Sequence, residues 1–179
     1  MKFYHGSMIK GLTQLQPHLP VGAHSQKPLV YLTTSHQLAL HYIWDTERLG
    51  VKMPMLDIRK DGTFVFQEMF SGALEYFYKG VSGYIYSAEN VTSAESMKDI
   101  PFAATSTEPV SVDACEYVPD AYEALKEAAD KGLIVIKKYS ENSEKMMAWI
   151  ERCIKEQYKI ASEIPDYKIF LEGKFKNIL

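Results

Sequence analysis

The sequence predicts an α+β fold in which mostly antiparallel sheets precede a helical C-terminal part. Short runs rich in β-branched and aromatic residues, separated by Gly and Pro, dominate the chain up to about residue 119. After residue 119, apolar residues recur mostly at helical spacing. The 179 residues, 46% of them hydrophobic and 24% charged, are enough to bury a real core.

Five runs are expected to form strands, and they cover residues 2–5, 29–33, 55–58, 63–69 and 83–87. Between the third and fourth runs, Asp61 and Gly62 are typical of a hairpin turn. The first 139 residues are therefore expected to form one sheet-rich core.

The expected helices follow from capping residues and apolar stripes. Ser35 is placed to cap a helix on which Leu38, Ala39, Tyr42 and Ile43 share the face towards the sheet. A second helix begins after Asp120, with Glu123 completing its cap, and ends at Gly132.

A strand over 133–138 is expected next, and then a helix up to Pro165. The apolar stripe of this helix contains Met146, Ile150 and Ile154, which predicts that it packs on the sheet. Residues 140–179 are thus expected to form a helical extension packed on the same domain.

Charge and cysteine content restrict the partners and the compartment. The net charge is −3, and arginine occurs only at positions 48, 59 and 152, so a nucleic-acid backbone is not a favoured partner. Cys115 and Cys153 lie far apart in the sequence, which predicts two buried thiols and no disulfide. Without a signal peptide or a membrane-spanning stretch, the expected location is the cytoplasm.

The first candidate site feature is the strand end His5-Gly6-Ser7. The glycine would let a ligand approach the main chain, and the histidine and the hydroxyl would offer adjacent hydrogen-bond donors. A turn between His and Gly at a strand end also occurs without any function, so this feature alone decides nothing.

The second feature is a pair of tyrosines. Tyr31 lies in a strand that runs into Thr33, and Tyr42 follows eleven residues after Tyr31, in the expected helix. Both rings can converge on the same end of the sheet and form a slot. A flat, positively charged ring would gain roughly 0.5–2 kcal/mol from such aromatic faces.

These residues resemble, in content and order, the ADP-ribosyltransferase superfamily, which cleaves NAD at the nicotinamide bond. His5, Gly6 and Ser7 resemble its His-Gly-Ser strand end, which holds the nicotinamide amide and the adenosine ribose. Tyr31 and Tyr42 are similar to the tyrosines of the poly-ADP-ribose polymerases. Residues 30–39 are similar to the small antibiotic-modifying ADP-ribosyltransferases. The resemblance covers about the first 45 residues, and a fainter one covers residues 104 to 132.

The resemblance also implies an acidic residue at the start of a later strand, where it would hold the 2′-hydroxyl of the nicotinamide ribose. Glu108 is the first candidate because it opens an alternating run after small hydroxyl residues. Pro109 departs from the pattern, since proline confines the segment to a sheet edge or a strand start. Glu68 is the alternative.

Other departures and alternatives concern the cations and histidines. The stretch 18–28, expected to close over the pyrophosphate, offers only His24 and Lys27. The RNA 2′-phosphotransferase branch of the superfamily needs arginines near these motifs, and this sequence lacks them there. No histidine pair has metal-ligand spacing, so no metal is expected.

The resemblance implies that NAD is the substrate and that His5, Gly6, Ser7, Tyr31, Thr33 and Tyr42 hold it. Glu108, His5 and Tyr31 would serve the reaction, with His5 as a positioning donor. The acceptor of ADP-ribose stays open: a protein, a small molecule, a nucleic-acid base, or water in a plain NAD glycohydrolase. A non-catalytic module of the same fold that binds NAD or another ligand is the competing class.

Overall fold

The computed structural model describes residues 1–19, 27–44, 56–59 and 61–179. The chain is mixed α and β, and its sheets are mostly antiparallel. The strands are β1 (Lys2–Ser7), β2 (Gln14–Leu15), β3 (Val30–Thr33), β4 (Leu56–Ile58), β5 (Phe64–Gln67), β6 (Gly83–Glu89), β7 (Glu95–Ser96), β8 (Ala103–Ser106), β9 (Val110–Ser111), β10 (Ala114–Val118) and β11 (Ile134–Lys137). The α-helices are α1 (His36–His41), α2 (Ala73–Tyr78), α3 (Ala121–Asp130), α4 (Glu144–Ile160) and α5 (Pro165–Lys174).

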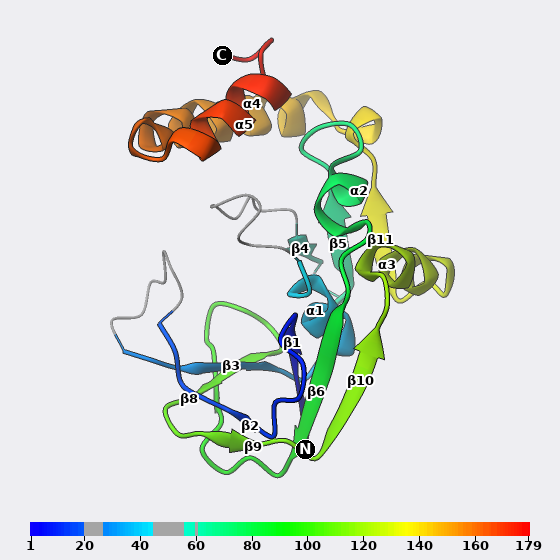
Figure 1. Cartoon of the computed structure of the whole chain (residues 1–179). Coiled ribbons are helices and arrows are strands. Elements are labelled where there is room, and N and C mark those ends of the chain that lie inside the picture. The colour runs from blue at the N-terminus through cyan, green and yellow to red at the C-terminus, as the bar shows by residue number, and fades with distance from the viewer. Residues whose placement is uncertain (20–26, 45–55, 60) are drawn as a thin grey trace.

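The largest sheet has six strands in the order β10-β6-β1-β3-β8-β7, and all its neighbours are antiparallel (Figure 1). Successive side chains of a strand point to opposite faces, so each face of this sheet collects alternate residues. One face carries Tyr4 and Ile85 into a core shared with α1 and α3. The other face carries Phe3 and Val30 into a second, smaller core.

The second core is covered by the short ribbon of β2 and β9. Leu15 of β2 pairs with Val110 of β9, and both side chains are almost fully buried against the sheet. Pro109 therefore directly precedes an edge strand of a two-stranded ribbon, as the proline predicts.

A second sheet contains β11, β5 and β4. The hairpin expected at Asp61 and Gly62 is confirmed, because β4 and β5 are antiparallel and Gly62 has a φ of 87°. The helix expected after Asp120 is also confirmed as α3. The side chain of Asp120 accepts hydrogen bonds from the main-chain N–H groups of Tyr122 and Glu123.

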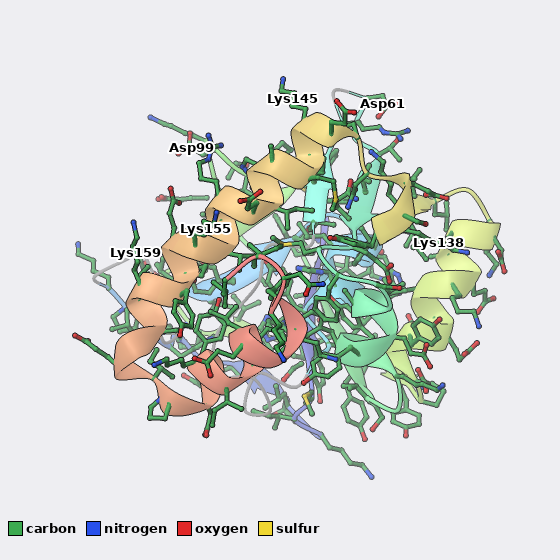
Figure 2. The ribbon with its side chains drawn as sticks, turned by 90° about the horizontal axis from the view of Figure 1, so that it is seen from above. Asp61, Asp99, Lys138, Lys145, Lys155 and Lys159 are labelled. Atoms are coloured by element: carbon green, nitrogen blue, oxygen red, sulfur yellow. The ribbon has the colours of Figure 1, made fainter. Side chains whose placement is uncertain are left out.

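Helices α4 and α5 lie at the end of the molecule opposite β2 and β9 (Figure 1). Ile150 and Ile154 of α4 and Leu171 of α5 are fully buried in the same core as Leu38 of α1. Lys145, Lys155 and Lys159 lie on the exposed side of α4 (Figure 2). The apolar stripe that predicted this helix is therefore its inward face.

The expectation of two buried thiols is wrong for Cys115, which is exposed, whereas Cys153 is half-buried. Cys115 lies in β10, and an edge strand of this kind leaves one side without a neighbour. Both thiols are free, so the expected lack of a disulfide is confirmed. Among the described residues, no helix is long and apolar enough to span a membrane.

Candidate functional site

Strands β1 and β3 diverge where the candidate residues lie. Their ladder contains one pair, Tyr4 with Thr33. Continuing that register would place Gly6 opposite Tyr31, but these two residues are not paired. On its other side, β1 pairs with β6 along its whole length, as far as Ser7. In the described part of the chain, residues 5–7 thus have no strand partner on the β3 side, and we call this unpaired stretch between β1 and β3 the opening.

His5 bridges this opening. Its Nδ1 lies 2.8 Å from the main-chain oxygen of Tyr31. Burial lowers the pKa of His5, although the Tyr31 carbonyl partly opposes that shift and His18 adds to it. The ring is therefore neutral at pH 7, and because a carbonyl only accepts, Nδ1 carries the proton. This leaves Nε2 as an acceptor, whereas the sequence suggested a donor.

Gly6 allows α1 to lie directly on β1. A Cβ atom at this position would lie 1.9 Å from the carbonyl oxygen of Ala39 and 3.3 Å from the Cβ of Tyr42. The space that the glycine leaves is thus occupied by the helix and is not open to a ligand, contrary to the interpretation from sequence. Its role is to bring the end of α1, and with it Tyr42, over the opening.

The rings of Tyr31 and Tyr42 lie on the same side of this opening. Tyr31 shares the α1 side of the sheet with Thr33, and Tyr42 directly follows α1. Burial raises the pKa of the Tyr42 hydroxyl, and the negative charge that Tyr31 would carry raises it further. Tyr42 is 41% exposed, more than its helical face predicted, so part of its ring is accessible.

Ser7 and Thr33 have local roles in the structure. The hydroxyl of Ser7 accepts a hydrogen bond from the N–H of Ile9 at 3.1 Å. The hydroxyl of Thr33 accepts one from the N–H of Ser35 at 3.0 Å, just before α1, and Thr33 is 3% exposed. Both oxygens therefore stabilise turns beside the opening.

His18 is a neighbour that the motifs did not single out. Its ring contacts Tyr31 edge-on, with ring centres 6.0 Å apart. Its main chain bonds in both directions with Leu29, which precedes β3. In the sequence, His18 could have been suggested as a site residue only by its place in the stretch 18–28, which was expected to cover the ligand. His24 of the same stretch lies outside the described residues.

Glu108 lies in the connection between β8 and β9, at the same end of the sheet as Tyr31. Thr105 of β8 pairs with Tyr31, and Glu108 follows three residues later, within about 10 Å of chain. The hydroxyl of Ser106 donates to the carbonyl of Glu108 at 2.8 Å and accepts from its N–H at 3.0 Å. This turn fixes the main chain of Glu108 and leaves its side chain exposed.

The alternative carboxylate, Glu68, is buried elsewhere. Its oxygens accept hydrogen bonds from the N–H groups of Leu74 at 3.1 Å, Tyr139 at 3.2 Å and Gly72 at 3.4 Å. At 8% exposure, this carboxylate joins the start of α2 to the segment after β11. Its bonding is that of a structural group.

Two hollows lie away from this opening. One, of about 270 Å³, lies beside Phe70 and Lys174 near the C-terminus, and the other, of about 360 Å³, lies along α3 from Pro119 to Asp130. Within the described ranges, no group of three His, Cys, Asp or Glu side chains is placed to hold a metal ion.

The site thus combines an opening between β1 and β3, a neutral histidine with an acceptor nitrogen, and two tyrosines, of which Tyr31 is half-buried and Tyr42 is exposed. Comparisons with protein-family models, with curated proteins and with solved structures found no significant match.

Proposed function

We propose that this protein binds NAD at the opening between β1 and β3, cleaves its nicotinamide glycosidic bond and transfers ADP-ribose to an acceptor. The observation that carries the proposal is the placement of Tyr31 and Tyr42 on the same side of the sheet, with Tyr42 directly over Gly6, where the pairing of β1 with β3 ends after Tyr4. The resemblance of these residues, with His5-Gly6-Ser7, to the ADP-ribosyltransferase superfamily supports it.

The nicotinamide ring would lie against Tyr31 and Tyr42. A pyridinium is flat and positively charged, so aromatic faces attract it both by stacking and through the ring quadrupole. Main-chain groups of Gly6, beyond the last β1–β3 pair, would bond the carboxamide. These contacts favour the charged ring of the ground state and so lower the KM for NAD.

His5 would bind a ribose hydroxyl. Its Nε2 accepts a hydrogen bond in the neutral ring, and the Tyr31 carbonyl fixes the ring's orientation through Nδ1. Because a hydroxyl can donate as well as accept, an acceptor nitrogen still suits the sugar.

Glu108 would supply the negative charge. When the glycosidic bond breaks, positive charge develops on the ribose, and a carboxylate at the 2′-hydroxyl stabilises it mostly near the transition state. A fixed group of this kind is worth about 3–4 kcal/mol, or about a hundredfold to a thousandfold in kcat.

Calorimetry with NAD, followed by chromatographic measurement of released nicotinamide, tests the proposal. We expect binding and release by the wild-type chain. Tyr117→Ala is the matched control, because Tyr117 is a 57% exposed tyrosine on the edge strand β10. Binding weakened by Tyr42→Ala and unchanged in Tyr117→Ala would support the site. Absence of NAD binding in the wild-type chain would refute it.

A second candidate function is a module that binds NAD without cleaving it. The observation in its favour is the carboxylate of Glu108, which is exposed. In the described part of the chain, no hydrogen bond or ion pair of that side chain fixes its direction, and catalysis of this kind requires a preorganised charge. Binding without release of nicotinamide would favour the module. For the enzyme, the acceptor is a protein, a small molecule, a nucleic-acid base or water.

A further inference from the structure

Helix α1 is too short to hold its own last turn in place. It has six residues, and an isolated helix of this length is not stable in water. The carbonyls of Ala39 and Leu40 accept hydrogen bonds from the N–H groups of Tyr42 and Ile43, but the last carbonyl of the helix, that of His41, needs a partner from another element. The direction of Tyr42, which directly follows His41, therefore depends on what contacts this end of α1.

Tyr78, the last residue of α2, provides such a contact. It is 1% exposed, and its hydroxyl lies 3.0 Å from the carbonyl oxygen of His41 and 2.7 Å from His41 Nδ1. The hydroxyl has one proton. When it donates that proton to the carbonyl, Nδ1 donates to the hydroxyl oxygen, and both groups of His41 are satisfied.

The imidazole of His41 extends this contact to the site. Its ring packs edge-on against Tyr42, with ring centres 5.3 Å apart, and against Phe66 of β5 at 5.4 Å. Burial raises the pKa of Tyr78 far above its usual value, and the charge that Tyr42 would carry adds to the shift. One buried hydroxyl thus connects α2, the end of α1 and the accessible tyrosine.

We propose that Tyr78 is a positioning residue of the candidate nicotinamide site, and that its hydroxyl sets the place of the Tyr42 ring through His41. This inference rests on the proposed function for its effect on NAD. Its effect on Tyr42 can be measured without NAD.

The test compares Tyr78→Phe with Tyr167→Phe. Tyr167 is also 1% exposed, and its hydroxyl bonds Gln157 between the C-terminal helices, so both variants lose one buried hydroxyl. We expect Tyr78→Phe to raise the KM for NAD by about twofold to thirtyfold, the value of a displaced aromatic partner, without a comparable fall in kcat. We expect Tyr167→Phe to leave the KM unchanged.

A double variant shows whether Tyr78 acts through Tyr42. In a Tyr42→Ala background, Tyr78→Phe should cause no further rise in the KM, because the ring that it positions is gone. An additional rise of the full size would overturn the inference, as would an unchanged KM in Tyr78→Phe alone.

Nuclear magnetic resonance of ¹³C-labelled tyrosine rings provides the second measurement. We expect the Tyr42 signals, identified by their loss in Tyr42→Phe, to shift in Tyr78→Phe and not in Tyr167→Phe. Unshifted Tyr42 signals would overturn the inference even if NAD binds. Shifted signals without NAD binding by the wild-type chain would support it and refute the proposed function.

Discussion

The imidazole of His5 forms a hydrogen bond with the main-chain carbonyl of Tyr31, and His5 directly follows Tyr4, the last residue of β1 that is paired with β3. A side-chain hydrogen bond thus takes the place of a main-chain hydrogen bond of the ladder, and it connects β1 with β3 where their pairing has ended. It also sets which nitrogen of His5 carries its proton.

The pH dependence of stability should reveal the buried, neutral state of His5. Its folded pKa is lowered from 6.5, so the unfolded chain binds the proton more tightly. The neutral His5 therefore makes its full contribution to stability above pH 6.5, and this contribution is lost as the pH falls from 6.5 towards the pKa of the folded state. Urea denaturation of the wild type and of His5→Asn between pH 5 and 8 measures the difference. We expect the wild type to lose more stability on acidification, and parallel curves would contradict this.

Gly6→Ala should destabilise the fold, because the new methyl group would lie 1.9 Å from the Ala39 carbonyl. Overpacking of this kind costs about 1–3 kcal/mol and would move α1 away from β1. Gly173→Ala is the control, since its Cβ meets no atom within 4 Å and α5 favours alanine over glycine. Thermal unfolding should show a lower Tm for Gly6→Ala alone. Equal melting temperatures would mean that the helix yields without cost.

Glu108 and Glu68 should differ in the property that each carboxylate controls: Glu108 should control the rate of the reaction, and Glu68 the stability of the fold. Glu108→Gln should lower kcat for nicotinamide release by about a hundredfold to a thousandfold. Because this side chain is exposed, stability should hardly change. Glu68→Gln should instead lower the free energy of unfolding by about 1.5–3 kcal/mol, since a charged acceptor of main-chain N–H groups is lost. An unchanged kcat in Glu108→Gln would remove Glu108 from the proposed mechanism.

Tyr31→Ala should raise the KM for NAD while kcat changes little, because stacking stabilises the bound pyridinium before the bond breaks. Steady-state kinetics of nicotinamide release measures both constants, with Tyr117→Ala again as the control. A fall in kcat at constant KM would show that the ring acts on the transition state instead.

Local signals in the sequence predicted much of the fold. Asp120 and Ser35 mark the starts of α3 and α1, and Gly62 marks the turn between β4 and β5. These residues act through their own backbone neighbourhood, so the pattern is readable. Helix α2 was not predicted, because Gly72 at its start provides no side-chain cap and the aromatic residues at its end are not typical of a helix. Strand β10 was not predicted, because four of its five residues are exposed and therefore do not alternate with buried ones.

The candidate site was less readable, because its geometry depends on contacts between distant residues. The structure places Tyr31 and Tyr42 on the α1 side of the sheet, and the convergence of their rings, which their spacing predicts, stays a prediction. The tautomer of His5 depends on a carbonyl 26 residues away, and the role of Gly6 depends on how closely α1 approaches. Neither follows from a motif.

The ribbon of β2 and β9 has a consequence for temperature. Glu108 is held between Ser106, paired with Val30, and Val110, paired with Leu15. The ribbon of β2 and β9 has two residues in each strand and is the smallest sheet among the described residues, and a two-stranded ribbon is only marginally stable by itself. Warming should release this ribbon before it disturbs the tyrosines. Turnover would then decline at a lower temperature than affinity for NAD.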